Sequence, residues 1–446
     1  MSVSQLTSPH QPVLLPTLQT SRPLRYVTFF YLYVMQGIPA GFALTAVANY
    51  LTAEGVKPNA VGTFVAAVGL PWTAQFVWGP LIDRFQGSIM GRRRPWVLLA
   101  QLMAFAASLG ILLVDNPVTQ LSMLAAAFFT HSVFATVQDA SVDAMAISII
   151  PASERGRVNA FMRGGFLVGI GLSAAAFSYL IRSYSFHTAA LTQSLILLVL
   201  TAVTFFVKEK PEDAWFPWSS APAAAVERKQ HDHSIGWLFR ELYRGLVARE
   251  SLQLFIPILV VYTSLSIFIR AYPVHLIQEL HWRDTDLSFM TGTYGTAVMV
   301  LFIFVGGWVA DRIGSRRLLV YVMLGCGLFL VTANALSPYW IYPRVASSIY
   351  VLYYVLDPLV SVAAMPALMA LCRRDVEGSQ FTTYMALVNL CDVAGSFISG
   401  HVQMVVKAPL IGLLCGVAIL SALAVTLWVD RQQRLIGSKP MQRFDL

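Results

Sequence analysis

Four aspartates lie inside long apolar stretches of this sequence, where water does not stabilise a charge: Asp139, Asp143, Asp357 and Asp392. An ionisable group within a membrane span costs roughly 2.5–3.5 kcal/mol, so each acid needs a structural or functional reason. Asp139 and Asp143 are one helical turn apart and therefore share a helix face. A carboxyl group that is removed from water and has a second carboxyl group beside it favours its protonated form. We predict a proton-coupling site at Asp139 and Asp143, with Asp357 as a further candidate.

Each acid also has a structural alternative. The first two could be structural carboxylates that Arg84 or Arg163 neutralises. Asp357 precedes Pro358 in the middle of its stretch, and a proline there frees a backbone carbonyl and favours a break in the helix beside a cavity. The alternative is a simple kink with a satisfied acid. Asp392 fits either a substrate contact or a polar contact between helices.

Further polar and aromatic residues in the apolar stretches are candidates for a substrate cavity: Gln36, Gln138, Arg270, Tyr354 and Asp392. The guanidinium of Arg270 could bind a carboxylate or a phosphate, because its planar donors match both groups. Its alternative is an arginine that reaches toward the membrane interface. Tyr354 could stack on a ring of the substrate, and its alternative is ordinary packing.

The composition predicts that these residues lie on membrane-spanning helices. The 446 residues are 57% hydrophobic and only 12% charged, which is too few charges to cover a soluble protein of this size. The sequence predicts an all-α polytopic membrane protein, embedded in a lipid bilayer, with twelve spans of about 20 or more residues. These spans cover residues 26–50, 60–82, 95–114, 118–150, 158–181, 188–207, 252–276, 287–310, 318–336, 346–371, 381–406 and 410–429.

Basic residues predict the orientation of the chain. With a cytoplasmic N-terminus, all but six of the 31 Lys and Arg residues fall on the cytoplasmic side, as the positive-inside rule requires. The net charge of +8 therefore indicates membrane topology rather than a nucleic-acid partner. We expect a six-helix half at 1–207, a cytoplasmic loop at 208–250 and a second six-helix half at 251–446, with both termini in the cytoplasm.

A short motif occurs at the same place in each half. Gly79-Pro-Leu-Ile-Asp83-Arg84 closes the second span, and Gly307-Trp-Val-Ala-Asp311-Arg312 closes the eighth. Both copies read Gly-x-x-x-Asp-Arg and both lead into a cluster of arginines. We expect each glycine to sit at a tight helix contact, and each acid with its arginines to lie at the inner interface. Two copies at matched positions indicate a parallel repeat, which is one plan of secondary transporters.

This doubled motif resembles the signature loop of the major facilitator superfamily, and the resemblance covers essentially the whole chain. In that family the acid and arginines of the loop latch the inner gate. The resemblance implies a conformational latch formed by Gly79, Asp83, Arg84, Arg92, Arg93, Arg94, Glu154, Arg155, Gly307, Asp311 and Arg312. The first copy departs from the family pattern, because residues 85–90 separate Arg84 from the Gly91-Arg-Arg-Arg94 cluster. The arginine that acts in the latch is therefore left open.

A narrower resemblance rests on five motifs in order along the chain: Gln36-Gly-Ile-Pro39, Trp78-Gly-Pro-Leu-Ile-Asp83, Gly91-Arg-Arg-Arg94-Pro-Trp96, Gln138-Asp139-x-x-x-Asp143-Ala144 and Pro151-x-x-Glu154-Arg155-Gly156. Together they resemble the AmpG-like, muropeptide-permease branch. That branch also includes siderophore permeases of the rhizobactin and pyochelin type and acetyl-CoA transporters. The Gln-Gly-Ile-Pro opening is more similar to the siderophore and acetyl-CoA members.

We therefore expect a secondary active transporter in the bacterial inner membrane, a proton-coupled importer of an amphipathic solute such as a muropeptide or a siderophore. The sequence has no Walker loop, no HExxH and no nucleophile elbow, so it predicts neither an ATP-driven pump nor an enzyme. We expect no cofactor and no metal, and a monomer. The alternatives are a permease for acyl-CoA or another small molecule, and a non-transporting membrane assembly factor of the same fold.

Overall fold

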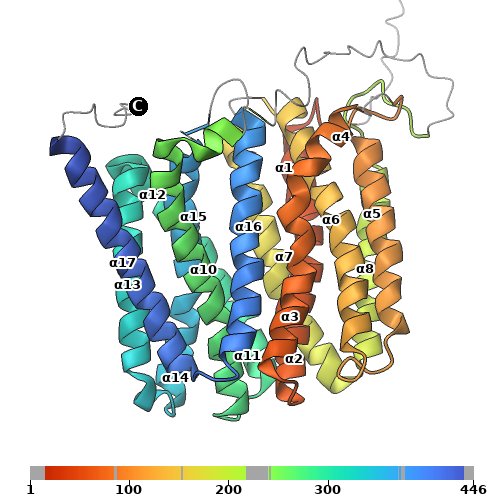
Figure 1. Cartoon of the computed structure of the whole chain (residues 1–446). Helices are drawn as coiled ribbons and strands as arrows, with labels where there is room; N and C mark the ends of the chain where they lie inside the picture. The colour runs from red at the N-terminus through yellow and green to blue at the C-terminus, as the bar shows by residue number, and fades with distance from the viewer. Residues whose placement is uncertain are drawn as a thin grey trace, which may run out of the picture.

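The structure is a computed structural model, and it describes residues 16–84, 88–151, 154–216, 240, 243–369, 371–372 and 377–435. Every regular element in these residues is a helix, as the sequence predicts. The helices run up and down between two faces, with α5, α6 and α8 on one flank and α13 and α17 on the other (Figure 1). We call the face with the arginine-rich α4–α5 and α12–α13 loops the inner face, and the opposite one the outer face.

The first half of the chain supplies the helices on one side of the molecule. They are α1 (Arg22–Gly41), a π-helical stretch (Phe42–Val47), α2 (Ala48–Ala53), α3 (Pro58–Gly69), a 3-10 stretch (Leu70–Val77), α4 (Trp78–Arg84), α5 (Arg94–Leu109) with a 3-10 end (Gly110–Leu113), α6 (Leu121–Ile149), α7 (Arg155–Ser183) and α8 (Phe186–Phe205).

The second half supplies the remaining helices. They are α10 (Arg249–Gln278), α11 (Asp284–Met290), a π-helical stretch (Thr291–Gly295), α12 (Thr296–Ile313), α13 (Ser315–Ala335), a 3-10 turn (Ser337–Tyr339), α14 (Pro343–Tyr353), α15 (Leu356–Met369), α16 (Glu377–Val402) and α17 (Ala408–Leu435).

Local sequence explains where several of these helices begin. Ser21 caps α1 by accepting a hydrogen bond from the Leu24 backbone N–H, and Ser185 caps α8 in the same way. Helices α3, α5 and α14 begin with a proline in the first turn, where its missing N–H costs nothing. Gly314, at a φ of 82°, makes the turn between α12 and α13, because a side chain would be strained there.

Eleven helical stretches among the described residues are long and apolar enough to cross a membrane. The eighth predicted span, 287–310, is also helical, because α11, the π-helical stretch and α12 follow one another without a break from Asp284 to Ile313. The predicted fold class is confirmed, and the chain is a multi-pass membrane protein. Its backbone groups bond within helices, as a bilayer requires.

The buried cores keep the two parts of the chain apart. One large cluster draws only on buried residues from 254 to 423, and two smaller ones draw only on buried residues from 18 to 190. Large apolar side chains outside these cores, such as Leu198 on α8 and Leu414 on α17, are exposed on the sides of the helix bundle. They are suited to face lipid.

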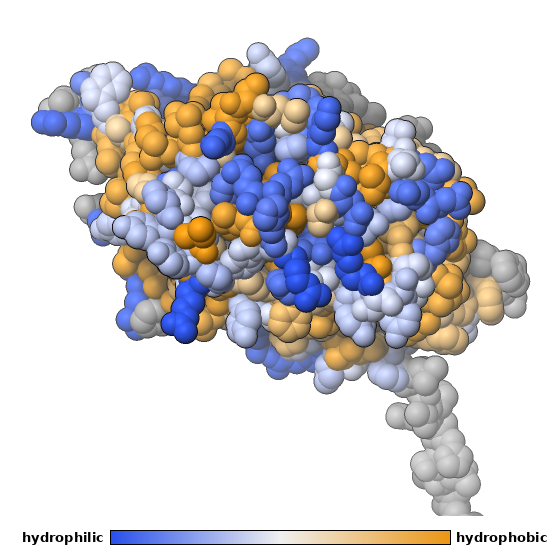
Figure 2. Space-filling view, turned by 90° about the horizontal axis from the view of Figure 1, so that it is seen from below, coloured by the Kyte–Doolittle hydropathy of each residue, from blue (hydrophilic) through white to orange (hydrophobic). Residues whose placement is uncertain are grey.

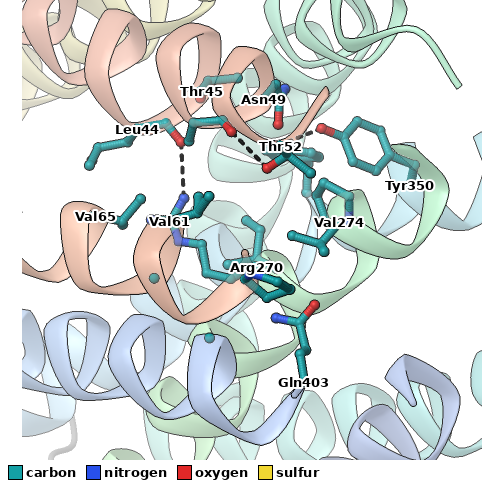
Figure 3. Close-up of a pocket in the computed structure, with 17 residues that line it drawn as sticks. Leu44, Thr45, Asn49, Thr52, Val61, Val65, Arg270, Val274, Tyr350 and Gln403 are labelled. Atoms are coloured by element: carbon teal, nitrogen blue, oxygen red, sulfur yellow. Dashed lines mark hydrogen bonds between the residues drawn. The ribbon is translucent and has the colours of Figure 1, made fainter. Parts of the chain in front are cut away.

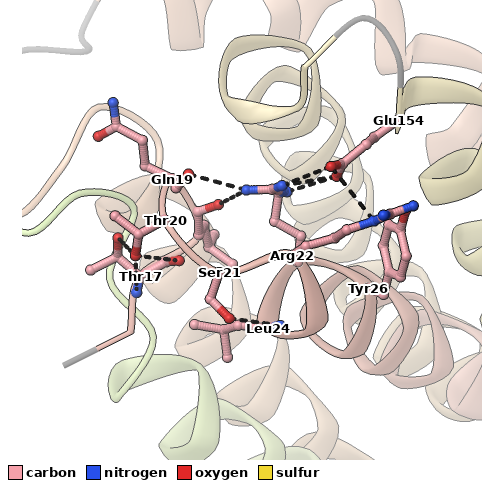
Figure 4. A network of polar contacts seen from close by, with 10 residues as sticks. Thr17, Gln19, Thr20, Ser21, Arg22, Leu24, Tyr26 and Glu154 are labelled. Atoms are coloured by element: carbon pink, nitrogen blue, oxygen red, sulfur yellow. Dashed lines mark hydrogen bonds and ion pairs between the residues drawn. The ribbon is translucent and has the colours of Figure 1, made fainter.

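Residues 16–21, which we call the N-terminal strap, fasten the inner end of the first half (Figure 4). The backbone N–H of Leu18 donates to the carbonyl of Lys208 at 3.0 Å, beyond the end of α8. Arg25 is 5% exposed, donates to the strap carbonyl of Leu18 at 2.9 Å, and forms two hydrogen bonds of 3.0 Å with Glu154. The start of α1 is thereby joined to the start of α7 and the end of α8.

The two ends of the central segment are each held by their own half. The N–H of Ala214 donates to the Ile89 carbonyl at 2.8 Å, and its carbonyl accepts from Arg94 Nη1 at 3.0 Å. At the other end, Gly245 packs so closely on the Gln380 side chain that an added Cβ would lie 2.8 Å from Nε2. The predicted amphipathic stretch 235–247 lies mostly outside the described residues.

Candidate functional site

The two aspartates of α6 lie on the face of that helix that meets α1. Asp143 accepts a hydrogen bond from the Tyr33 hydroxyl, and Asp139 lies beside Tyr33 and Gln36. Asp139 is about 15 Å along α6 from its inner end, at 1.5 Å per residue. The predicted pair is therefore on one face and well inside the membrane.

Two predicted cavity residues are buried next to these acids. Gln36 is 4% exposed and Gln138 is 3% exposed. Neither amide nitrogen makes a regular hydrogen bond within the described residues. A buried polar group without a partner is costly, so these two amides are suited to a water or to a ligand.

Arg163 of α7 brings a positive charge to the same place. It is about 12 Å along α7 from its inner end, and its side chain is exposed. Its charge acts on Asp139 and Asp143 in its own half, and on Asp357 in the other half. The structure describes no hydrogen bond or ion pair between Arg163 and a described residue.

Asp357 lies where its span is interrupted. Helix α14 ends at Tyr353 and α15 begins at Leu356, so the predicted break near Pro358 is confirmed. Asp357 is exposed, and its charge interacts with that of Asp392 on α16. The charge of Arg163 in the first half also acts on Asp357.

Arg270 and Asp392, which the sequence places far apart, are brought together. Arg270 Nη2 lies 3.7 Å from Asp392 Oδ2, which is a loose ion pair, while Ser266 donates to Asp392 Oδ1 at 2.6 Å. Arg270 also donates to the Ser396 hydroxyl and across the interface to the carbonyl of Leu44, both at 3.2 Å. Arg270 therefore turns into the interface between the halves.

Six charged residues thus form a continuous series between the two halves, which we call the charge series: Asp143, Asp139, Arg163, Asp357, Asp392 and Arg270. Its first three members belong to the first half and its last three to the second half, and Asp392 keeps 47% of its side chain exposed. Four acids face two arginines, so protonation of two acids would make the series neutral. Such an arrangement can bind a charged group and exchange protons.

Tyr354 lines a small pocket between the two halves. Figure 3 shows this pocket, with Tyr350, another of its lining residues, labelled. Its hydroxyl accepts a hydrogen bond from Thr291 at 3.0 Å, and Thr291 also lies 2.9 Å from the Tyr350 hydroxyl. Arg270 and Asn49 line the same pocket, whose cavity volume is only about 40 Å³. That volume holds a few water molecules, whereas ligand pockets are usually several hundred Å³. The outer path is closed here.

Polar side chains hold the halves together at the outer face. Arg182 of α7 lies 2.9 Å from Asp284 of the second half and 2.6 Å from Glu54 of its own half, and its guanidinium covers the Tyr50 ring. Gln278 donates to two carbonyls of the first half at 3.1 Å. Figure 2 shows this face, with hydrophilic side chains across its middle and no wide opening.

Two pairs of glycines let the backbones of the halves touch. A Cβ on Gly62 of α3 would lie 2.5 Å from a carbonyl oxygen of α16 and 2.9 Å from Cα of Gly400. A Cβ on Gly292 would lie 2.3 Å from the carbonyl oxygen of Gly171 on α7. Real Cβ atoms do not come this close to backbone atoms, so only glycine permits both contacts.

The latch residues are described only in part. The surroundings of Gly307 and the side chains of Asp83, Arg84, Arg155 and Asp311 are outside what the structure describes. The expectation of a tight helix contact at Gly79 is wrong, because a Cβ there would meet nothing within 4 Å. Gly79 follows the 3-10 stretch at the inner end of the second span, and no described atom of a neighbouring helix lies within 4 Å of a Cβ built there.

The three clustered arginines lie at the start of α5. Their backbone N–H groups all donate to the Glu209 carboxylate, at 2.5–3.2 Å. The Arg94 side chain is 1% exposed and donates to the backbone carbonyls of Met90 and Ala214. Arg312, in the second copy, is exposed. Glu154 binds Arg25, which sequence reasoning counted only as a cytoplasmic cation.

Sequence reasoning also missed the inter-half roles of Arg163 and Arg182. Arg163 was considered only as a partner that neutralises the acids of α6. Its signal was present, because it is a single arginine inside the apolar span 158–181. The partner of Arg182 is about 100 residues away in the sequence, and no pattern in the chain links the two.

Comparison with known proteins identifies the family of this chain. The family model of the Major Facilitator Superfamily matches residues 27–400 and 254–441. The chain belongs to this superfamily and is one of its transporters. It is similar to the anhydromuropeptide permease of Escherichia coli K12, with 24% identity over 380 residues, 82% of this chain and 72% of the relative. An uncharacterised protein of Haemophilus influenzae is 25% identical over 291 residues, 64% of each chain.

Proposed function

We propose that this protein is a proton-coupled importer of an amphipathic solute of the muropeptide class, acting in the bacterial inner membrane. The observation that carries the proposal is the charge series, in which acids of both halves and two arginines face one another inside the membrane. Costly charges of this kind mark ion and substrate pathways in transporters. The likeness to the anhydromuropeptide permeases supports the substrate class.

The mechanism we infer is alternating access between residues 1–207 and 251–446, around the charge series. The described inter-half contacts close the outer side, while Arg163 and Asp357 remain exposed. This combination is expected of an inward-facing state. Opening of the outer contacts would expose the same charges to the outer side, where the acids take up protons with the solute. Return to the inward-facing state would release both.

Transport into proteoliposomes tests the proposal. With an inwardly directed proton gradient, a radiolabelled anhydromuropeptide should accumulate inside the proteoliposomes above its equilibrium level. A protonophore should abolish this accumulation. A ferric siderophore, tested in parallel, distinguishes the other substrate class that the sequence motifs suggested. Absence of gradient-driven accumulation of the muropeptide would contradict the proposed substrate. Accumulation that survives the protonophore would contradict the proposed coupling.

A further inference from the structure

Arg270 and Asp392 form an open ion pair. Arg270 Nη2 lies 3.7 Å from Asp392 Oδ2, which is too far for a hydrogen bond. The ion pair of Arg182 with Asp284, by contrast, is closed at 2.9 Å. The side chains of Arg270 and Asp392 are 19% and 47% exposed, so neither charge is fully enclosed by the protein. Two opposite charges thus lie side by side without a bond between them.

Uncharged partners hold the two charges in place. Ser396 accepts a hydrogen bond from Arg270 Nε and the carbonyl of Leu44 accepts one from Nη1, both at 3.2 Å. Ser266 donates to Asp392 Oδ1 at 2.6 Å. The other three N–H groups of the guanidinium, which has five, and the Oδ2 atom of Asp392 make no hydrogen bond with a described residue. Hydrogen-bonding capacity therefore remains on both members of the pair.

The open pair lies where the two halves meet. Asn389, about one helical turn before Asp392 on α16, donates across the interface to the carbonyl of Trp72 at 3.3 Å. Arg270 lines the pocket of about 40 Å³ between the halves (Figure 3). Its bond to Leu44 also crosses the interface, so separation of the halves at the outer face breaks this bond and frees a further donor. Under alternating access, the pair is on the path of the solute.

The charges of the open pair select a ligand that carries both signs. An anion alone would be attracted by Arg270 and repelled by Asp392, and a cation alone would meet the reverse. An amino-carboxylate group has a carboxylate for the guanidinium, which binds carboxylates through parallel hydrogen bonds. Its ammonium group can donate to the unbonded carboxylate oxygen. The net charge of this group is zero, so its binding keeps the charge balance of the pair.

We propose that Arg270 and Asp392 bind an amino-carboxylate end of the transported solute, with its carboxylate on Arg270 and its ammonium group on Asp392. The inference rests on the proposed function and names the chemical group that one part of its site recognises. Binding requires little ordering of the two side chains, because their uncharged partners already hold both of them.

Three matched probes test this inference by isothermal titration of the purified full-length protein. The parent probe is an anhydromuropeptide whose peptide ends in meso-diaminopimelate, which has a free amine and a carboxylate on one carbon atom. The second probe has this amine acetylated, and the third has this carboxylate converted to an amide. The variants are Arg270→Gln, Arg270→Lys and Asp392→Asn. The controls Arg344→Gln and Asp286→Asn change exposed residues in the first turns of α14 and α11.

Each modification of the probe should weaken binding to wild type and to both controls about tenfold or more. Arg270→Gln should bind the parent and the amide equally and remain sensitive to acetylation, and Asp392→Asn should show the reverse. Arg270→Lys should keep part of the preference for the carboxylate, because it keeps the charge and loses the planar fork. These crossed patterns distinguish ligand contact from a structural role, which would weaken the binding of all three probes alike.

Four results overturn the inference: equal affinity of wild type for the three probes, binding of none of them, the same loss for all three in a folded variant, or a variant that keeps the sensitivity it should lose. The first two need only wild type, so the test holds even where a variant fails to fold. Gradient-driven accumulation of all three probes at one rate in proteoliposomes would support the proposed function and contradict the inference. Selective binding without accumulation would do the opposite.

Discussion

Arg182 on α7 and Asp284 at the start of α11 form an ion pair of 2.9 Å that joins the two halves at the outer face. Asp284 is only 5% exposed, so little water can replace this partner. Arg182→Gln should weaken the closed outer side by about 1–2 kcal/mol, because both partners of Arg182 lose a charged donor. The outward-facing population should rise roughly tenfold.

Labelling from outside measures this shift. In a background without the four native cysteines, Asn49→Cys in the outer pocket should react faster with an impermeant maleimide when Arg182→Gln is present. Arg344→Gln removes another outer arginine and should leave the rate unchanged. An unchanged rate in Arg182→Gln would show that the ion pair does not hold the outer face closed.

The glycine contacts predict a larger effect. In Gly62→Ala the new Cβ would lie 2.5 Å from a backbone oxygen of α16, so the two helices must separate. The outer face should then fail to close, and gradient-driven uptake should fall at least tenfold while the amount of folded protein is retained. Gly325→Ala is the matched control, because its Cβ would meet nothing within 4 Å. Normal uptake by Gly62→Ala would contradict the backbone contact.

Asp139→Asn imitates a permanently protonated side chain. It should abolish gradient-driven accumulation and leave counterflow exchange of solute, since exchange needs no net proton movement. Asp143→Asn replaces the charged acceptor of the Tyr33 hydroxyl with a weaker, neutral amide oxygen and should slow both processes. The comparison is made in proteoliposomes with an imposed pH gradient. If Asp139→Asn still accumulates solute as steeply as wild type, Asp357 becomes the next candidate for proton coupling.

The pair between Arg25 and Glu154 should contribute to stability rather than to transport. Arg25 is almost fully buried, and removal of one member of a buried ion pair costs about 3–5 kcal/mol. Arg25→Met should therefore lower the melting temperature in detergent more than the double variant Arg25→Met/Glu154→Leu. A double variant that melts no higher than Arg25→Met would show that no uncompensated charge is left behind.

Glu209 provides a prediction about pH. Burial raises the pKa of this carboxyl group above its usual value, although three backbone N–H groups donate to it. A carboxyl group with a higher pKa in the folded protein binds its proton more tightly there, so its contribution to stability is present at low pH and is lost as pH rises through the folded value. Glu209→Gln has no such dependence and loses one acceptor at every pH, at a cost of about 1 kcal/mol.

The stability margin of wild type over Glu209→Gln should therefore be largest near about pH 4 and should narrow toward about pH 7. Melting temperatures of both proteins across this range provide the measurement. A margin that grows with pH would mean that the ionised carboxylate stabilises the start of α5.

The helices and their order could be predicted because a bilayer imposes long apolar stretches, and the charges at their ends indicate their orientation. Asp139 and Asp143 could be assigned to one helix face because the helical repeat links residues four positions apart. The pairs Arg270–Asp392 and Arg182–Asp284 join residues more than 100 positions apart. Helical periodicity relates only residues a few positions apart, so it could not predict these pairs. The helix break before Pro358 was predictable from that proline alone.

The glycine contacts between helices could not be predicted from sequence motifs either. Gly79 belongs to a repeated motif, yet a Cβ there would meet no described atom within 4 Å, whereas Gly62 and Gly400 belong to no motif and touch across the interface. A motif records which residues recur in the chain. Close approach depends on how two helices cross, and that follows from the packing of both halves.

The two ends of the central segment have one more consequence. Ala214 is bonded to Ile89 and Arg94 of the first half, and Gly245 packs on Gln380 of the second. Each residue must follow its own half when the halves move. The distance between positions 214 and 245 therefore changes with the conformational state of the transporter. One pair of spin labels beside these positions would measure that change, and the measurement needs no labelled substrate.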